Sequence, residues 1–148
     1  MRAADPEIRP AHAADMDSAT RLLRDAGLPV DDLSAELLEN FLVASSGTAI
    51  VGMIGLEPFP GIGLLRSLVV DPGTRGAGVG RLLVAELEAL ARRRGLSQLW
   101  LLTIDADPYF SSLGYQVQDR GRAPEAIRGT AEFSTLCPGD AVLMMKTV

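Results

Sequence analysis

Short apolar segments alternate with polar turns along the chain, and their periodicity predicts both helices and strands. Apolar residues recur at helical spacing in four segments, 14–28, 32–38, 78–94 and 106–113. Asp15 is a predicted N-cap of the first helix, and Gly27 and Gly95 are predicted C-terminal stops. Strands are predicted over seven segments, 7–11, 40–47, 48–57, 62–70, 97–103, 114–120 and 141–147.

The order of these segments predicts an α/β (α+β) domain. A meander of strands comes first and a strand-helix-strand unit follows, so we expect a mixed sheet rather than a wholly antiparallel one. The run 62–70 is rich in Leu and Val, which is typical of a strand buried on both faces. The 148 residues contain no repeat, low-complexity tract or long linker, so we expect a single domain over 1–148.

Composition narrows the range of functions. The formal net charge of -5 gives no basic surface for a nucleic-acid backbone. Cys137 is the single cysteine and His12 the single histidine, so the sequence predicts no internal disulfide and no metal site. No apolar run reaches the roughly 18 residues of a membrane span, and we expect a cytoplasmic protein with no membrane partner.

A glycine-rich turn, "RGAGVG" at 75–80, follows the strand "LLRSLVV" and opens the third predicted helix. A P-loop would need a lysine after the last glycine, where Arg81 stands. The dinucleotide fingerprint fails because its third glycine would fall on Arg81 or Leu83. Uncovered amides at a helix N-terminus suit an anion such as a pyrophosphate, although the glycines are also compatible with a tight turn alone.

Two ordered motifs resemble those of the GNAT superfamily of N-acetyltransferases. Arg75-x-x-Gly78-x-Gly80 matches the acyl-CoA motif Q/R-x-x-G-x-G/A. About thirty residues on, the family's N-x-x-A-x-x-[FL]-Y-x-x-x-G-[FY] is matched in part by a second set, Thr103, Ala106, Tyr109, Phe110, Gly114 and Tyr115. Longer stretches, "YFSSLGY" and the tail "RAPEAIRGTAEFSTLCPGDAVLMMK", resemble the small arsenic-resistance N-acetyltransferases of the ArsN type.

The resemblance implies the GNAT fold, with about seven strands, about four flanking helices and a sheet splayed between the fourth and fifth strands. It also implies acetyl-CoA as cosubstrate. The backbone of an unpaired strand edge can hydrogen-bond to the amides of pantetheine, which then binds like an added strand. The residues implied for CoA are Leu68, Val69, Val70, Arg75, Gly76, Ala77, Gly78, Val79, Gly80, Arg81, Ala106 and Phe110.

Acetyl transfer needs an oxyanion donor and a route for protonating the departing thiolate. By family analogy, the backbone N–H near Leu68 is the oxyanion donor. The usual acid of the family is a tyrosine, but Phe110 stands there and cannot donate a proton. Tyr109 is kept as a catalytic candidate, although on a helix it would point about a hundred degrees away. Tyr115, water or unassisted thiolate departure are the alternatives, and our hypothesis is that no essential side-chain acid exists.

The acceptor side rests on fewer residues. Glu57, at the end of a central strand, is the candidate base, the alternative being a solvent-facing glutamate. Arg66 lies in an apolar strand, where a charge must be paired or face a ligand. It is predicted to bind a substrate carboxylate with help from Ser67 and Thr103, or else to form a structural ion pair with an acid such as Glu57.

The sequence thus predicts an N-acetyltransferase for a small amino-acid-like amine, with an organoarsenical as one acceptor that the resemblance implies. Alternatives are a protein or peptide N-acetyltransferase and a non-catalytic acyl-CoA-sensing module. Cys137 is interpreted as a packing and turn residue, His12 as a loop residue and Trp100 as core. By analogy with relatives that pair through C-terminal strands, a homodimer is expected.

Overall fold

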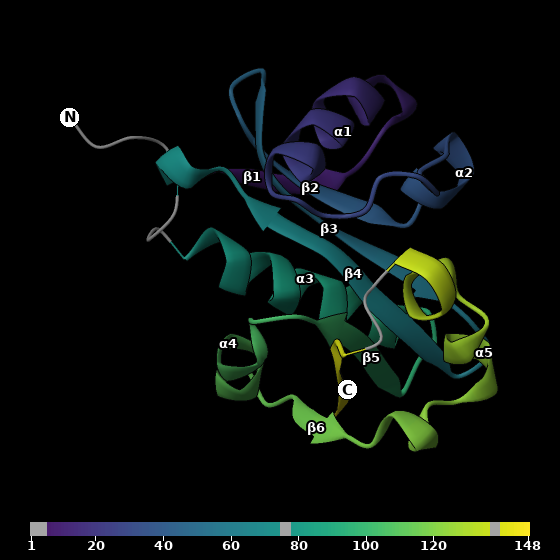
Figure 1. The fold of residues 1–148 in the computed structure, drawn as a ribbon. Helices are drawn as coiled ribbons and strands as arrows, with labels where there is room; N and C mark the ends of the chain where they lie inside the picture. The colour runs from purple at the N-terminus through teal and green to yellow at the C-terminus, as the bar shows by residue number, and fades with distance from the viewer. Residues whose placement is uncertain (1–5, 75–77, 137–139) are drawn as a thin grey trace.

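The computed structural model describes residues 6–74, 78–136 and 140–148, which build one seven-stranded sheet (Figure 1). The strands are β1 (Glu7–Pro10), β2 (Phe41–Ser46), β3 (Ala49–Pro58), β4 (Ile62–Val70), β5 (Gln98–Thr103), β6 (Gln116–Gln118) and β7 (Val142–Thr147). They lie in the order β1-β2-β3-β4-β5-β7-β6. Only the β4–β5 pair is parallel, so the predicted mixed and mostly antiparallel sheet is confirmed.

Helices cover both faces of this sheet. Figure 1 shows α1 and α2 over one face and α3 and α4 on the other. The α-helices are α1 (Met16–Asp25), α2 (Ala35–Leu38), α3 (Val79–Arg93), α4 (Asp107–Ser112) and α5 (Glu125–Arg128). Shorter helical turns are η1 (Ala13–Asp15), η2 (Pro72–Thr74), η3 (Arg120–Arg122) and the π-helical turn η4 (Glu132–Leu136). The four helices predicted from periodicity correspond to α1 to α4.

The apolar stripes of α1 and α3 pack on opposite faces of the sheet. Ala19 and Leu23 of α1 are fully buried against β2 and β3, whereas Leu83 and Leu87 of α3 are fully buried in the core on the other face. This arrangement follows from helical spacing, which gathers the apolar residues of each helix on one side. β4 is therefore covered from both sides, as its apolar sequence predicts.

The two predicted helix C-termini are confirmed, whereas the predicted N-cap of α1 makes other hydrogen bonds than a cap would. Gly27 and Gly95 adopt φ values of 73° and 77°, in the left-handed region that glycine tolerates at a helix C-terminus. Asp15 occupies the N-cap position of α1, but its side chain makes no capping bond to that helix. Its carboxylate instead pairs with Arg9 at 2.9 Å and accepts the His12 amide at 2.7 Å.

The C-terminal third departs most from the prediction. The strand expected over 114–120 is confined to β6, and α5 and η4 fill a segment for which we predicted no helix. These helical elements span four and five residues, too few for a 3.6-residue period to show. β7 inserts between β5 and β6, a long-range pairing that local pattern does not encode.

The β4–β5 junction determines where a ligand can enter the sheet. The parallel ladder joins residues 62–64 to residues 98–100, so among the described residues the strands pair at one end of β4 only. On its other side β4 bulges, because Ser67 and Leu68 together face Ile54 between the Arg66 and Val69 pairs. Ser67 adopts φ 59°, a conformation uncommon for a residue with a side chain. β4 and β5 are thus separated beyond their shared start, which confirms the predicted splay.

Candidate active site

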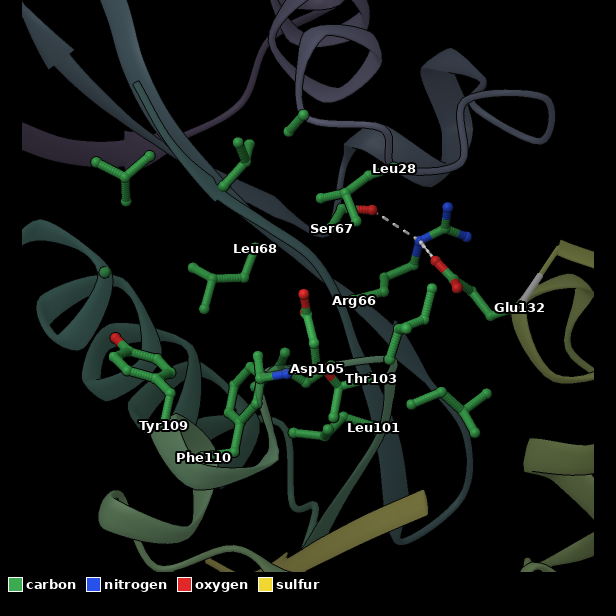
Figure 2. A pocket seen from close by; sticks show the side chains of 18 of the residues that line it. Leu28, Arg66, Ser67, Leu68, Leu101, Thr103, Asp105, Tyr109, Phe110 and Glu132 are labelled. Carbon is green, nitrogen blue, oxygen red and sulfur yellow. Dashed lines mark hydrogen bonds and ion pairs between the residues drawn. The ribbon is translucent and has the colours of Figure 1, made fainter. Parts of the chain in front are cut away.

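The cavity lies where β4 and β5 separate. It has a volume of about 960 Å³ and is open to solvent. Its walls come from the α1–α2 loop (26–29), β4 (64–70), the start of α3 (78–81), the end of β5 with its following loop (101–106), α4 and Glu132. Figure 2 shows Tyr109 and Glu132 on opposite sides of this pocket, with Leu68, Ser67 and Thr103 between them.

One end of the cavity, which we call the donor end, is built from the first turn of α3. Gly78 is the N-cap, has φ 77° and accepts the Leu82 amide through its carbonyl at 3.0 Å. The amides at the start of a helix have no partner four residues earlier, and the helix dipole adds positive character there. Val79, Gly80 and Arg81 contribute to this end, while Arg75, Gly76 and Ala77 lie outside the described residues.

Gly80 is in contact with Tyr109 of α4. A Cβ at position 80 would lie 2.9 Å from the Tyr109 hydroxyl oxygen and 3.6 Å from a methyl of Val70. The absent side chain therefore leaves room for the phenol above the backbone of α3. Tyr109 is 36% exposed, and burial raises its pKa while the charge of Arg81 opposes that rise. The Tyr109 hydroxyl thus lies at the donor end of the cavity.

The edge of β4 that faces the cavity forms the wall between the two ends. Leu68 and Val70 are partly buried and Val69 is buried, and all three line the cavity. Their backbone runs beyond the residues that pair with β5. This extended edge has the shape that an amide-bearing ligand can join as a further strand.

Phe110 of α4 and Tyr115 are both buried in the core, and of these two residues only Phe110 also lines the cavity. Phe110 is 6% exposed and touches the cavity, where its ring lies edge-on to those of Tyr109 and Tyr115. Tyr115 is 2% exposed and its hydroxyl donates to Glu88 at 3.0 Å. Burial and the neighbouring Glu88 carboxylate raise the pKa of Tyr115. Tyr115 does not contribute to the cavity wall, so the geometry does not support it as a proton donor there.

The other end of the cavity, the acceptor end, is built around Arg66. Its guanidinium is almost completely buried and contacts carboxylates from three separate segments of the chain. Asp32 takes both terminal nitrogens, Glu57 lies 2.8 Å from Nη1, and Glu132 lies 3.2 Å from Nε. Burial alone would lower the pKa of Arg66, but Asp32, Glu132 and Glu57 raise it above its ordinary value. The structural ion pair with Glu57, the alternative for Arg66, is present.

The three predicted acceptor residues differ in whether they line the cavity. Ser67 lines it, and its hydroxyl accepts from Arg66 Nε at 3.0 Å (Figure 2). Thr103 also lines it, and its hydroxyl accepts the amide of Ala106 at 3.0 Å, which fixes the start of α4. Glu57 does not contribute to the cavity wall; its carboxylate faces Arg66.

Asp32 and Glu132 are site residues that the sequence did not single out. Glu132 lines the cavity and its side chain is 7% exposed, while Asp32 is the bidentate partner of Arg66. The signal was the buried charge of Arg66, which requires carboxylates. Which carboxylates pair with Arg66 depends on tertiary contacts, because Asp32 and Glu132 lie far from Arg66 along the chain.

The other residues with candidate chemistry have ordinary surroundings. His12 is exposed in the loop before η1, and Trp100 is 5% exposed in the core with Leu64 and Leu143. Cys137 lies outside the described residues.

Over 6–74, 78–136 and 140–148, no group of three or more His, Cys, Asp and Glu side chains is arranged to hold a metal ion. None of the helices in those ranges combines the length and apolar character that crossing a bilayer requires.

Comparison of the sequence with known proteins identifies its relatives. The model of the acetyltransferase (GNAT) family matches residues 9–115. An amino-acid acetyltransferase of Ralstonia nicotianae is 36% identical over 80 residues, which cover 53% of this chain and 18% of that protein. The chain therefore spans less than a fifth of that relative. An uncharacterised N-acetyltransferase of Chlorobaculum tepidum is 27% identical over 159 residues that cover both chains completely.

Solved structures share the fold. N-acetylglutamate synthase from Neisseria gonorrhoeae, complexed with coenzyme A and N-acetyl-glutamate, has a TM-score of 0.83 at 22% identity. The similarity covers 99% of this chain and 36% of the synthase. A Mycobacterium tuberculosis protein in complex with CoA has a TM-score of 0.81 at 22% identity, over 97% of this chain and 99% of that one.

Proposed function

Because this chain belongs to the acetyltransferase (GNAT) family, we propose that it transfers the acetyl group of acetyl-CoA to the amine of a small amino-acid-like acceptor. The observation that carries the proposal is the cavity between β4 and β5, which joins a helix N-terminus, the edge of β4 beyond its pairing with β5 and a charged pocket. Solved proteins with this fold bind CoA. In this proposal the donor occupies the helix N-terminus and the strand edge, and the second substrate occupies the charged pocket.

The donor residues follow from the geometry of the cavity. Backbone amides of Val79, Gly80 and Arg81 would bind the pyrophosphate, with the Arg81 side chain adding positive charge. The edge of β4 at Leu68 to Val70 would bond to the pantetheine amides. With the pantetheine extended along β4 in that register, the thioester would lie near the bulge at Ser67 and Leu68. A backbone N–H there would stabilise the oxyanion.

The reaction itself needs few side chains. The neutral amine attacks the thioester carbonyl, a C–N bond forms and the C–S bond breaks. The acceptor starts as an ammonium ion, whose nitrogen loses one proton to become neutral and a second proton as the amide forms. The departing CoA thiolate takes up one proton. A thiolate leaves without a strong acid at neutral pH because the pKa of its thiol is about 8.5. This chemistry is consistent with phenylalanine at position 110.

Relatives favour an amino-acid-like acceptor. The Ralstonia protein is named an amino-acid acetyltransferase, and the synthase of similar fold was solved with N-acetyl-glutamate. An amino-acid-like organoarsenical belongs to the same chemical class, since its α-amine would react in the same way. It is therefore one arm of the test and not a separate mechanism.

A peptide acceptor is the second candidate, because the N-alpha-acetyltransferase 80 of mouse is 44% identical over 54 residues, or 36% of this chain. The peptide-type relative matches less of this chain than the amino-acid acetyltransferase of Ralstonia nicotianae, which covers 53% of it. The small-molecule reaction is therefore preferred.

The test is release of CoA thiol from acetyl-CoA across a panel of amines. The panel contains amino acids, an amino-acid-like organoarsenical, phosphinic amino acids, polyamines and peptides with free N-termini. We expect release with at least one amino-acid-like amine. Release with peptides alone would support protein acetylation, and tight CoA binding with no release would support the acyl-CoA sensor instead.

A further inference from the structure

We propose that Glu132 binds the amine of the acceptor, and that Arg66 is a positioning residue that does not bind the acceptor's carboxylate. The inference rests on the proposed acetyltransferase function and defines its acceptor site. It revises the expectation that Arg66 recognises a substrate carboxylate and that Glu57 serves as the base.

The first argument is that each of the three nitrogens of the Arg66 guanidinium already contacts a carboxylate of the protein. Nε contacts Ser67 Oγ at 3.0 Å and Glu132 at 3.2 Å, and both terminal nitrogens contact Asp32. Glu57 adds a further contact at 2.8 Å, and the arginine side chain is 1% exposed. A substrate carboxylate that binds the guanidinium through two N–H groups would have to displace one of these partners and leave its charge without the arginine.

The second argument is charge. Three carboxylates surround one guanidinium, so this group of four side chains carries a net negative charge when all are ionised. Coulomb attraction at short range then favours a cation at the adjoining cavity wall and disfavours an anion. An acceptor amine in its ammonium form has the required charge.

The third argument selects Glu132 from the three carboxylates. Glu132 contributes to the cavity wall, whereas Asp32 and Glu57 do not. Figure 2 shows its side chain entering the site from the C-terminal segment and meeting Arg66 at Nε. Arg66 thereby holds in place a carboxylate that is also accessible from the cavity.

The segment that carries Glu132 is well anchored. The Thr130 hydroxyl donates to the Ile127 carbonyl at 2.7 Å and accepts the Phe133 amide at 3.2 Å. Ile127 is fully buried, and the Phe133 ring lies under the Arg120 guanidinium at 4.5 Å. These contacts fix Glu132 to the sheet, so its carboxylate is pre-organised before an acceptor binds.

The role of Glu132 is to bind and orient the nitrogen. The acceptor enters as an ammonium ion beside this carboxylate and loses one proton to solvent before it attacks the thioester. Ser67 and Thr103, which also line the cavity, lie between Glu132 and the donor end in Figure 2. The nitrogen is therefore held on the β4 side on which the acetyl group is expected.

The test compares two single-charge neutralisations, Glu132→Gln and Glu57→Gln. Each removes one carboxylate that contacts Arg66, but only Glu132 lines the cavity. The probe is a net-neutral amino acid, L-alanine, or whichever panel amine the wild type acetylates fastest. We expect Glu132→Gln to raise the acceptor KM roughly 10- to 100-fold and to change the acetyl-CoA KM less than about twofold, because a charge-assisted hydrogen bond is lost. Glu57→Gln should raise the acceptor KM less.

A second comparison separates binding of the amine from a general structural effect. The analogue of the probe in which a hydroxyl replaces the amine should inhibit the wild type only weakly, with at least about tenfold lower affinity than the amine. In Glu132→Gln the two molecules should bind with similar affinity. Glu132→Asp should recover part of the loss, and it serves as the test variant if Glu132→Gln does not fold.

The outcomes separate the inference from the function on which it rests. If the wild type acetylates an amine and Glu132→Gln leaves the acceptor KM unchanged, or if Glu57→Gln has the larger effect, the assignment of Glu132 is overturned. If the amine and its hydroxyl analogue bind the wild type equally, the assignment is also overturned. If the wild type acetylates no amine at all, the proposed function fails first and the inference fails with it.

Discussion

The two ends of the cavity are built in different ways. The donor end is made from consecutive residues of the first turn of α3, and it presents mostly backbone. The acceptor end is made from side chains of four separate segments that meet at Arg66. A backbone site depends on local geometry, whereas a side-chain cluster depends on the whole fold being in place.

The difference explains what each end can recognise. Amides at a helix N-terminus bind any suitable phosphate and change little with side-chain substitution. A cluster of three carboxylates and one arginine is selective for charge, and each member depends on the others. We therefore expect substitutions at the donor end to act on the acetyl-CoA KM and those at the acceptor end to act on stability or on the acceptor KM.

The largest effect is expected from Arg66→Met, which leaves the buried Glu132 carboxylate and the partly buried carboxylates of Asp32 and Glu57 without their shared cation. Breaking a buried ion cluster by removing one partner costs roughly 3–5 kcal/mol. The free energy of unfolding from urea titration should fall by about that amount. A loss below about 1 kcal/mol would show that the carboxylates relax into solvent and that the cluster does not hold the acceptor end together.

A smaller effect is expected at the donor end from Gly78→Ala. The residue has φ 77°, where a side chain costs about 1–2 kcal/mol. Apart from the two chain neighbours, no atom of the residues that the structure describes lies within 4 Å of the added Cβ, so the cost comes from the backbone and not from a clash with them. Reorienting the α3 amides should raise the acetyl-CoA KM about tenfold while the acceptor KM stays nearly constant. An equal rise in both KM values would contradict the separation of the two ends.

Tyr109→Phe tests whether the donor end contains a catalytic acid. The hydroxyl lies over Gly80, so we expect its loss to change kcat less than about twofold and to raise the acetyl-CoA KM slightly. A general acid would contribute about 10²–10⁴ to the rate. Because burial raises the pKa of Tyr109, the phenol stays protonated at neutral pH, and the alkaline limb of the kcat profile should match the wild type.

Tyr115→Phe is the matched control for that experiment. It removes the hydrogen bond to Glu88, which also binds Lys146 at 3.0 Å, and should lower the free energy of unfolding by about 1 kcal/mol. Neither KM should change. A loss of turnover in Tyr115→Phe with normal acetyl-CoA affinity would disprove the hypothesis that no essential side-chain acid exists.

The smallest effect is expected from the Arg9–Asp15 pair, which lies outside the cavity and has a partly exposed arginine. The hydrogen bond from Arg9 lowers the pKa of Asp15, against a smaller opposing contribution from burial. Its stabilisation is therefore present above the ordinary aspartate pKa and is lost as pH falls through the lowered value. Arg9→Met should cost less than about 1 kcal/mol at pH 7, and the difference from wild type should vanish in acid.

The sequence predicted α3, its glycine-rich start and most of the fold because these features are local in origin. The α3 helix, the apolar β4 strand and the glycines at 78 and 80 follow from periodicity and from backbone freedom. The β4–β5 splay was implied by family resemblance, because the separation of two strands leaves no periodic signature.

The acceptor end could be predicted only in part. Arg66 was recognisable because a charge in an apolar strand requires partners, and Glu57 was the one partner named. Glu132 lies 66 positions later, in a π-helical turn that periodicity cannot detect. Its contact with Arg66 depends on η4 packing against the sheet, which is a tertiary result.

The most direct measurement is a structure of the protein with CoA and an acceptor amine bound. The account predicts the pyrophosphate on the amides of the first turn of α3 and the acceptor nitrogen within hydrogen-bond distance, about 3 Å, of the Glu132 carboxylate. Arg66 should keep Asp32 and Glu57 as partners. An acceptor carboxylate bound to Arg66, with Glu132 turned away from the nitrogen, would contradict it.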